Sequence, residues 1–346
     1  MTETRQPLAP ARILGIESSC DETAAAVVDN GRALISSVVA SQNDLHAKYG
    51  GVFPEVASRQ HIRTIYAVVE QALQQAHMSL SDLDAIAVTR GPGLAGSLVV
   101  GMNTAKGLAL AGGLPLVGVN HLEGHIYSAW VHSADVPPPP EPRFPLLALL
   151  VSGGHTELNL MTDHLTYQRL GSTQDDAAGE AFDKVARLLK LPYPGGPSIQ
   201  KASASGSPKI FNLPRAWMEG TWNFSFSGLK TAVLRIVREY ETNHRQIPVE
   251  DMAASFQAAV VDVLVGKTLA AAKAYKVKEI LVAGGVSANK ALREAFQAQQ
   301  DFPVHIPSLS LTTDNAGMIA AAGYFRHVLG HHDPLNLDVM PTWPLS

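Results

Sequence analysis

Two histidines and one aspartate have the residue types and the spacing of a metal site. His121 and His125 are four residues apart, so on a helix both side chains project from one face. Two imidazoles placed in this way can share one metal ion, and Asp314 can supply a third ligand. A His, His, Asp set leaves coordination positions open for substrate oxygens. Structural histidines and a helix-capping aspartate are the alternatives, and the three residues together favour a metal site.

The glutamate inside this motif does not match a metalloprotease. In His-Glu-x-x-His sites the glutamate directly follows the first histidine. Here Glu123 follows His121 by two positions, so on a helix it points away from the face that the histidines share. The spacing weakens the hypothesis of a metal-dependent peptidase.

Two further carboxylates, Asp21 and Glu22, lie at a polar tip between two predicted strands. Either could act as a general base or help to organise a metal and phosphates, and a solvated hairpin tip is the alternative. Cys20 beside them is the chain's only cysteine, and we expect a small buried residue rather than a nucleophile. One cysteine excludes an internal disulfide and a cysteine-based zinc site, which favours a reducing cytoplasm.

Glycine-rich turns follow two predicted strands, at 151–155 and at 284–289. Such turns expose backbone N–H groups, so the pair fits a nucleotide held between two lobes, with ligand-free tight turns as the alternative. Asp183 lies in an acidic, helix-opening segment and could accept hydrogen bonds from the hydroxyl groups of a ribose or an amino acid. The turn at 91–96 matches G-x-G-x-x-G, but no acidic residue follows about 20 positions later, so a dinucleotide fingerprint is rejected.

The elements that must position these residues recur in the two halves of the chain. A buried strand, a polar tip and a returning strand are predicted at 13–28 and again at 146–161. Asp29-Asn30-Gly31 predicts a hairpin turn. Further strands are expected at about 32–40, 84–89, 116–119 and 279–283. Helices are expected at about 60–77, 96–111, 121–131, 180–190, 228–243, 249–276, from 287 onward, and 314–329.

A proline-dense segment at 137–142 predicts a linker or hinge between two lobes. We expect a first lobe at 1–140, with 315–346 returning to it, and a second lobe at 141–314. A chain of 346 residues suits about two domains. The fold class predicted is therefore α/β, with two related lobes that face each other.

Composition limits the possible partners. No apolar run approaches the roughly 20 residues of a membrane helix, and the first 12 residues lack the apolar region of a signal peptide, so no membrane partner is expected. The net charge of −4 argues against a large basic face that grips nucleic acid alone. If RNA is the substrate, a local patch or a partner subunit must supply most of the phosphate contacts.

Several of these motifs resemble one protein family. They occur in family order, span about 13 to 325, and together are highly specific to the bacterial TsaD family of tRNA N6-adenosine threonylcarbamoyltransferases, formerly labelled O-sialoglycoprotein endopeptidases. The matching segments are Gly15–Thr23, Asn120–His125, Val151–His155, Asp176–Lys184, Tyr193–Pro197 and Gly284–Asn289.

The resemblance implies the two-lobed fold of actin, sugar kinases and heat-shock chaperone ATPases, with duplicated mixed-sheet domains. It implies transfer of threonylcarbamoyl from threonylcarbamoyl-AMP to N6 of adenosine 37, in tRNAs that read codons beginning with A. AMP would be released, and the substrate would be held in the cleft between the lobes. Such a reaction would make the chain a cytoplasmic, tRNA-modifying acyltransferase.

The family's functional residues carry over by motif. His121, His125 and Asp314 would bind one divalent metal per subunit, with iron(2+) preferred and zinc as the alternative. Asp21 and Glu22 match the acidic tip and would be catalytic. The adenylate would be bound by Leu150, Val151, Ser152, Gly153, Gly154, Asp183, Gly196 and Asn289. The expected partners are tRNA, a pseudo-enzyme paralogue (TsaB-like) and a small ATPase (TsaE-like).

Three other functions are compatible with the sequence. A metal-dependent peptidase is suggested by the histidine pair, and a small-molecule kinase is suggested by the fold class. The third is a non-catalytic scaffold, in which His125 and Asp314 would be dispensable.

Overall fold

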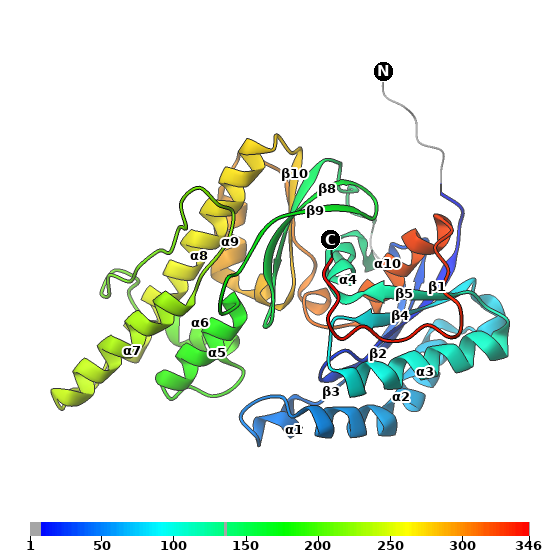
Figure 1. Cartoon of the computed structure of the whole chain (residues 1–346), viewed down its shortest axis with the longest axis horizontal. Helices are drawn as coiled ribbons and strands as arrows, with labels where there is room; N and C mark the ends of the chain where they lie inside the picture. The colour runs from blue at the N-terminus through cyan, green and yellow to red at the C-terminus, as the bar shows by residue number, and fades with distance from the viewer. Residues whose placement is uncertain (1–7, 135–136, 346) are drawn as a thin grey trace. The chain divides into compact units, whose positions relative to one another are not determined.

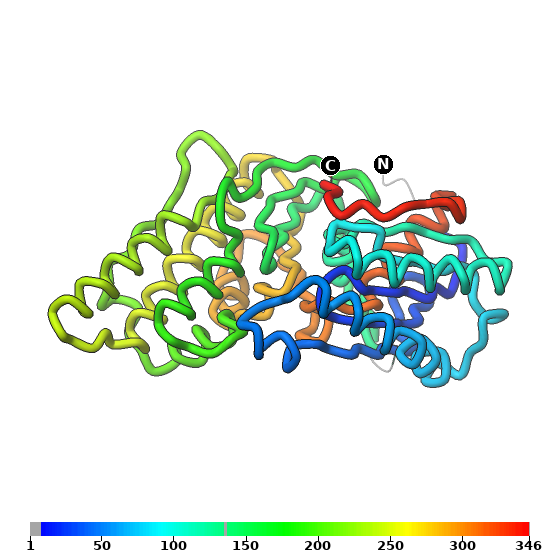
Figure 2. Tube along the Cα trace, turned by 60° about the horizontal axis from the view of Figure 1, so that its bottom comes forward, coloured from blue at the N-terminus to red at the C-terminus, as the bar shows by residue number. Residues whose placement is uncertain are grey.

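The computed structural model describes residues 8–134 and 137–345. The chain divides into two compact units: unit 1 comprises the residues up to Glu141 together with Asp314–Leu345, and unit 2 comprises Pro142–Thr313. Each unit contains its own β-sheet with helices packed on it, as the cartoon in Figure 1 and the trace in Figure 2 show.

Unit 1 is built on a six-stranded sheet in the order β5-β4-β1-β2-β3-β6. The central strands β1, β2 and β3 are antiparallel, whereas β4 and β5 extend the sheet parallel to β1. The strands are β1 Arg12–Glu17, β2 Glu22–Asp29, β3 Ala33–Ser41, β4 Ala85–Gly91, β5 Leu116–Asn120 and β6 His132–Ser133.

Helices cover both faces of this sheet, which explains why β1 and β2 are almost entirely buried along their length. On one face, α2 and α3 pack over a core that includes Leu14, Ile16 and Val27. On the other face, α10 contacts β1, β2 and β4, and α4 packs against α10. The helices of unit 1 are α1 Asn43–Ala47, α2 Pro54–Ala76, α3 Ala95–Gly112, α4 His121–Tyr127 and α10 Ala316–Val328, with short 3-10 turns at Leu80–Asp82 and Ser128–Trp130.

Unit 2 is built on a five-stranded sheet in the order β11-β10-β7-β8-β9. Again an antiparallel trio, β7 to β9, is extended by parallel strands, here β10 and β11. The strands are β7 Leu146–Val151, β8 Thr156–Asp163, β9 Thr166–Ser172, β10 Glu279–Ala283 and β11 Val304–His305. The helices are α5 Ala178–Leu188, α6 Gly195–Ser203, α7 Ser227–Thr242, α8 Val249–Ala274 and α9 Lys290–Ala298, with 3-10 turns at Gly285–Ala288 and Leu309–Leu311.

The predicted strand, tip and returning strand are confirmed in both halves, as β1–β2 and β7–β8. The hairpin predicted at Asp29-Asn30-Gly31 is also confirmed, because Asn30 and Gly31 have φ values of 54° and 68°. Two helix starts differ from expectation. Helix α2 begins at Pro54, where a proline fits the first turn, rather than near 60. Helix α9 begins only at Lys290, after a 3-10 turn.

Helix α8 is the longest apolar helix of the described structure, and Asp262 and Lys267 interrupt its apolar sequence. By length and composition alone this helix could cross a membrane, but 72% of its most apolar window is buried within the described structure. Its buried side chains, such as Phe256 and Val260, belong to the core of unit 2. The apolar character of α8 is therefore accounted for by its position as a central core helix.

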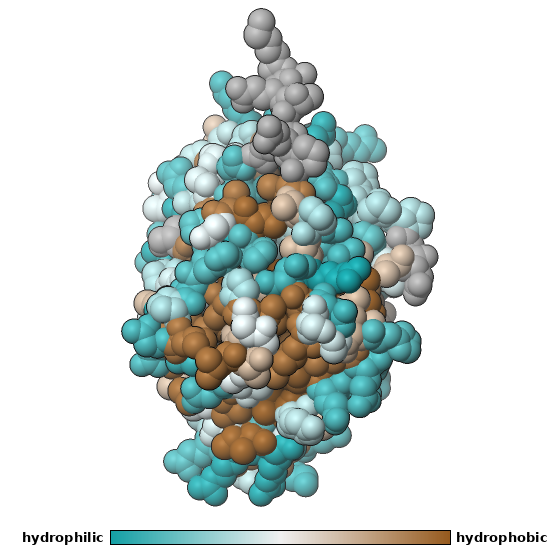
Figure 3. All heavy atoms as spheres, turned by 90° about the vertical axis from the view of Figure 1, so that its right-hand side faces the viewer, coloured by the Kyte–Doolittle hydropathy of each residue, from teal (hydrophilic) through white to brown (hydrophobic). Residues whose placement is uncertain are grey.

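Apolar side chains also reach the surface. Figure 3 views one face of the molecule, on which hydrophobic residues gather in a broad central area. On helix α2, Ile62 and Tyr66 are 66% and 74% exposed, and they lie one turn apart on the same side of the helix. Exposed apolar groups of this kind are typical of protein–protein contact surfaces.

The contact between β1 and α10 leaves no room for a side chain at Gly15. A Cβ atom there would collide with the carbonyl oxygen of Ala316 and would lie 2.7 Å from the backbone nitrogen of Ala320. We therefore predict that Gly15→Ala lowers the free energy of unfolding by about 3 kcal/mol, measured by urea denaturation. The control is Gly107→Ala in α3, where nothing lies within 4 Å. It should stabilise the protein by up to ~1 kcal/mol, and equal effects of the two changes would contradict the close packing.

Candidate active site

The two histidines and the aspartate singled out in the sequence lie together in unit 1. His125 Nε2 is 3.3 Å and His121 Nε2 is 3.5 Å from the same oxygen, Oδ1 of Asp314. One ligand atom from each residue lies within 4.8 Å of those of the other two. Metal–ligand bonds of about 2.0–2.2 Å bring neighbouring ligand atoms to roughly 3–3.5 Å from one another, so this donor set fits a single divalent metal.

Local structure fixes the position of each of these side chains. His121 is the first residue of α4, whose start is capped by Asn120: the side-chain Oδ1 accepts a hydrogen bond from the Leu122 backbone nitrogen at 2.9 Å. His125 follows one turn later, and the two imidazole rings meet edge to face with centroids 4.7 Å apart. The i, i+4 geometry predicted from the sequence is thus present.

Asp314 does not cap the helix that follows it. The cap of α10 is Asn315, whose Oδ1 accepts a hydrogen bond from Met318 N at 2.9 Å. The alternative explanation of Asp314 as a helix cap is therefore wrong, because its neighbour performs that role. The Asp314 carboxylate remains directed at the two histidines.

A fully buried carboxylate lies behind His121. Oε2 of Glu17 is 3.1 Å from His121 Nδ1, and it also accepts a hydrogen bond from the Thr89 hydroxyl at 2.6 Å. With Nδ1 donating to this carboxylate, Nε2 is left as the ligand atom, which is the usual arrangement of a carboxylate behind a metal-binding histidine. Sequence reasoning missed Glu17. A glutamate that ends a wholly apolar strand is the signal that could have found it.

The electrostatics of the cluster are dominated by its carboxylates. Burial alone would lower the pKa of His121, but Asp314 and Glu17 outweigh it and hold that pKa well above its usual value. Burial would likewise raise the pKa of Asp314, yet the charge of His121 keeps it far below the normal range. Nδ1 of His125 is buried and has no hydrogen-bond partner among the described residues. The two carboxylates beside His121 therefore give the cluster the negative charge that a cation site requires.

The Glu123 carboxylate is paired with an arginine, so it is not available to act as a base at the histidine–aspartate cluster. Its buried carboxylate forms an ion pair with Arg326 of α10, through Nε to Oε1 and through Nη2 to Oε2 at 3.3 Å. A metallopeptidase needs a glutamate free to act on the metal-bound water. Glu123 cannot take that role while it is paired in this way.

The acidic tip, Asp21 and Glu22, belongs to the same unit. Burial raises the pKa of Asp21, and it raises that of Glu22 to about 7, helped by the nearby charges of Asp21, Asp314 and Glu17. One Glu22 oxygen accepts a hydrogen bond from Ser41 at 2.8 Å, while Oε2 is buried without a partner among the described residues. A carboxylate that changes charge near neutral pH is suited to general base catalysis.

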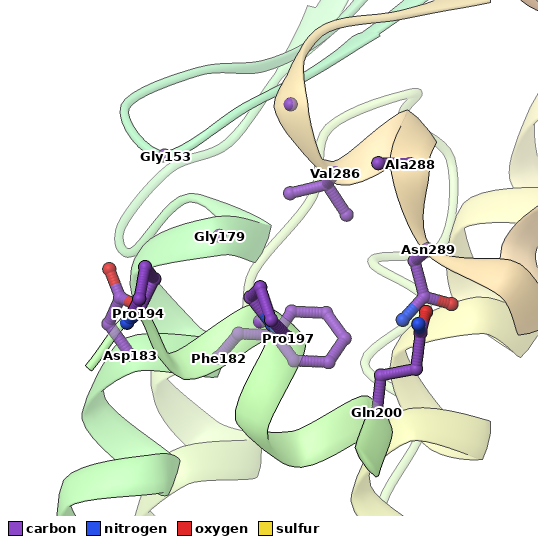
Figure 4. Close-up of a pocket in the computed structure, with 12 residues that line it drawn as sticks. Gly153, Gly179, Phe182, Asp183, Pro194, Pro197, Gln200, Val286, Ala288 and Asn289 are labelled. Carbon is purple, nitrogen blue, oxygen red and sulfur yellow. The ribbon is translucent and has the colours of Figure 1, made fainter. Parts of the chain in front are cut away.

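Unit 2 contains a pocket of about 250 Å³ between its glycine-rich turns and two helices. Four of the predicted substrate residues line it: Gly153, Asp183, Gly196 and Asn289. Figure 4 shows Asp183 on one side of the pocket, with the Asn289 and Gln200 amides close together on the other. The remaining lining residues are Gly179, Phe182, Pro194, Pro197, Gln200, Gly285, Val286 and Ala288.

The other four predicted substrate residues do not line this pocket. The side chain of Val151 is part of the hydrophobic core, and Leu150 is equally buried in β7. Ser152 closes the turn after β7, where its hydroxyl accepts a hydrogen bond from His155 N at 3.1 Å. Gly154 lies in the same turn and is exposed. Of the predicted residues in this turn, Gly153 lines the pocket, and having no side chain it offers its backbone groups.

Internal hydrogen bonds fix the polar groups of the pocket. Asn289 caps α9 through Leu292 N at 3.0 Å and donates to Gln257 at 2.8 Å, so most of its amide is already used. One oxygen of Asp183 accepts from Gly195 N at 2.8 Å, which leaves the other available. Gln200 was missed by sequence reasoning, although its place one turn after Gly196 on α6 puts both on one helix face.

The two-sheet architecture with a pocket on glycine-rich turns defines an actin-like fold, and solved structures support this class. HypF in its phosphate- and nucleotide-bound form superposes with a TM-score of 0.60 at 12% identity, covering 94% of this chain and 56% of that one. Component A of (R)-2-hydroxyglutaryl-CoA dehydratase from Acidaminococcus fermentans superposes with a TM-score of 0.52 at 14% identity. The match covers 91% of this chain and 98% of that one. At these identities the likeness concerns the fold alone, and it confirms the predicted fold class.

Sequence comparison identifies the family. The family model TsaD, tRNA N6-adenosine threonylcarbamoyltransferase, matches residues 33–321. Proteins of that name from Dehalococcoides mccartyi and Geobacillus kaustophilus are 55% identical over 331 residues and 54% identical over 338 residues. The alignments cover 96% of this chain in both cases, and 98% and 96% of those relatives. The chain belongs to the tRNA N6-adenosine threonylcarbamoyltransferase family, so the predictions of a transferase and of tRNA modification are confirmed.

The raised pKa of Glu22 predicts a pH-dependent effect of its removal. Because the folded-state pKa lies above the unfolded value of 4.5, the stability contribution of the protonated form is lost as pH rises through about 7. Glu22→Gln should therefore stabilise the metal-free protein at about pH 8 relative to about pH 5. We expect about 1 kcal/mol after discounting for partial exposure, measured by urea unfolding. The same effect of the substitution at both pH values would contradict the buried, ionisable state of Glu22.

Proposed function

We propose that this chain transfers threonylcarbamoyl from threonylcarbamoyl-AMP to N6 of adenosine 37 in tRNAs that read codons beginning with A, releasing AMP. The observation that carries the proposal is the convergence of His121, His125 and Asp314 on one donor set, with Glu17 behind it, in a member of this family. The proposed cofactor is one divalent metal per subunit, with iron(2+) preferred and zinc as the alternative.

The donor set of His121, His125 and Asp314 supports a metal-assisted transfer of the threonylcarbamoyl group. A metal held there would supply Lewis acidity toward a carbonyl or phosphoryl oxygen and a template for the substrate. The role of the protein is to fix the ligands: Glu17 orients His121, and Asn315 frees Asp314 from helix capping. Two histidines and one carboxylate leave positions for substrate oxygens.

The proton lost by the attacking amine needs an acceptor, and the acidic tip supports one. An exocyclic adenine amine is neutral and weakly nucleophilic, so it must lose a proton as the new bond to the carbamoyl carbon forms. Glu22, with a pKa of about 7, is half ionised near neutral pH and is our proposed base, with Asp21 as the alternative. AMP leaves as a stable phosphate monoester anion.

The pocket of unit 2 is proposed to bind the adenylate. Its glycine-rich turns bring backbone close to a ligand, and Phe182, Pro197 and Val286 give it apolar walls suited to an aromatic base. The free oxygen of Asp183 can accept a hydrogen bond from a ribose hydroxyl. On the side of the pocket opposite Asp183, the amide atoms of Asn289 and Gln200 that make no internal hydrogen bond can contribute to recognition of the adenylate.

The protein partners remain proposals. We propose that the chain acts in the cytoplasm with a pseudo-enzyme paralogue (TsaB-like) and a small ATPase (TsaE-like). The net charge of −4 supports a requirement for help in binding tRNA. The exposed apolar pair Ile62 and Tyr66 on α2 supports a protein contact on that helix.

A reconstituted transfer assay tests the function and the metal together. Purified protein, its bacterial partners, threonylcarbamoyl-AMP and unmodified tRNA are mixed, and threonylcarbamoyl-adenosine is quantified by mass spectrometry of digested RNA. We predict that His125→Ala lowers the transfer rate at least about 100-fold, because the donor set loses its most buried ligand.

The matched control is His327→Ala, which removes an α10 histidine that pairs at the surface with His332 at 3.0 Å. This control should retain the wild-type rate. Product formation by His125→Ala at the wild-type rate would refute the metal site, whereas no product from the wild type with partners that support a known enzyme would refute the proposed reaction.

Filling the pocket tests the adenylate site separately. Val286→Trp should place an indole in the 250 Å³ space and weaken AMP binding by at least about tenfold in isothermal titration calorimetry. The control is Ile210→Trp, at an exposed position of unit 2 outside the pocket lining. If AMP binds the two variants equally well, the adenylate site lies elsewhere.

A further inference from the structure

The segment that follows α10 runs back along the side of the unit 1 sheet formed by β5 and β4. In Figure 1 this red segment passes β5 and β4, and its end lies beside α4. Its hydrogen bonds agree: Gly118 N of β5 donates to the Asp333 carboxylate at 2.8 Å, and Met340 N donates to the Arg90 carbonyl of β4 at 2.8 Å. We call residues Met340–Pro344 the strap.

The strap reaches the metal-binding helix through Asn120. The Oδ1 atom of this residue caps α4, while its Nδ2 atom donates to the carbonyl oxygens of Trp343 at 3.1 Å and Pro344 at 3.3 Å. Asn120 is buried and directly precedes His121. One amide therefore joins the strap to the first turn of the helix that carries both histidines.

A second connection runs through the Trp343 ring. Arg90 and Arg326 lie over this ring, with their guanidinium carbons 5.3 Å and 5.9 Å from its centroid. Arg326 also holds the buried carboxylate of Glu123, which lies between the two histidines in the sequence of α4. The strap thus contacts α4 at its cap and, through Arg326, in its middle.

Packing against the sheet limits how far the strap can move. Gly93 N donates to the Pro341 carbonyl at 3.1 Å, and a Cβ atom at Gly91 would collide with the Met340 carbonyl oxygen. Backbone-to-backbone contact of this kind holds Trp343 and Pro344 at a defined place relative to Asn120. The strap is therefore anchored to β4 independently of α4.

We infer that the strap is a positioning element for the metal-binding helix: by fixing the Asn120 amide and the Arg326–Glu123 pair, it sets the orientation of His121 and His125. This inference rests on the metal site of the proposed function. Trp343 and Asn120 are not members of the donor set and act on it through α4. Mutation of residues that hold the ligands of a metal site in place typically lowers metal affinity 10–100-fold.

The test uses full-length protein and Co²⁺, whose visible absorption reports both affinity and ligand geometry. Trp343→Ala removes the ring that both arginines contact, and Trp343→Phe keeps an aromatic face. Asn120→Ser keeps an uncharged helix cap but removes the amide that reaches the strap. We expect about tenfold weaker Co²⁺ binding for Trp343→Ala and Asn120→Ser, and affinity near wild type for Trp343→Phe.

Hydrogen exchange of the metal-free protein provides a readout that does not depend on the metal. The backbone amides of α4 should exchange faster in Trp343→Ala, while those of β1 and of unit 2 keep their protection. AMP binding to unit 2 should be unchanged, which separates a local effect on α4 from general destabilisation.

The outcomes are distinguishable. Weaker Co²⁺ binding and faster α4 exchange, both restored in Trp343→Phe, support the inference. Wild-type affinity and wild-type α4 exchange in both Trp343→Ala and Asn120→Ser overturn it while leaving the metal site intact. Failure of the wild type itself to bind Co²⁺ overturns the metal site of the proposed function, and the inference with it.

Discussion

The burial of the Glu17 carboxylate is the constraint on which the rest of unit 1 depends. An ionised carboxylate removed from water is costly unless hydrogen bonds and charges compensate it. Here the compensation comes from three elements at once: Ser19 N after β1, the Thr89 hydroxyl of β4, and His121 Nδ1 of α4. Displacing any of these would leave the charge unsatisfied, so the carboxylate fixes the relative positions of β1, β4 and α4.

This constraint explains the charge balance around the site. Glu17, Asp21, Glu22 and Asp314 belong to one unit and influence one another, and burial together with these neighbours raises the pKa of Glu22. His121 supplies positive charge beside these carboxylates, because it interacts with both Glu17 and Asp314. A divalent cation at the cluster would offset the excess negative charge and would free His121 from serving as the cation itself. The electrostatics of the described residues therefore favour metal binding independently of the family resemblance.

Much of the site could be predicted from the sequence because its signals are local. The four-residue spacing of His121 and His125 needs only the geometry of a helix, and glycine-rich turns after apolar strands indicate ligand contact. A capping role for Asp314 stayed open as the alternative because Asp314 and Asn315 are adjacent and both types cap helices well, and the structure places Asn315 at the cap. The pairing of Glu17 with His121 could not be predicted by such rules, since the two residues are 104 positions apart and only the sheet register brings them together.

Three helices at the candidate sites share a capped first turn, whereas α5 and α6, which also line the pocket, begin without a side-chain cap. Among the described α-helices, α4, α9 and α10 have a capping side chain that accepts a backbone hydrogen bond, and in each case it is an asparagine: Asn120, Asn289 and Asn315. These are the helices that begin at His121, at the pocket and beside Asp314.

Helices such as α2 and α8 begin at prolines or extended residues and are held mainly by packing. Packing tolerates small shifts along a helix axis, whereas a side-chain cap fixes the first turn. Asparagine also offers an amide that can donate elsewhere, as Asn120 does to the strap and Asn289 does to Gln257, so the cap that defines a ligand's position can also be tied to the surrounding structure.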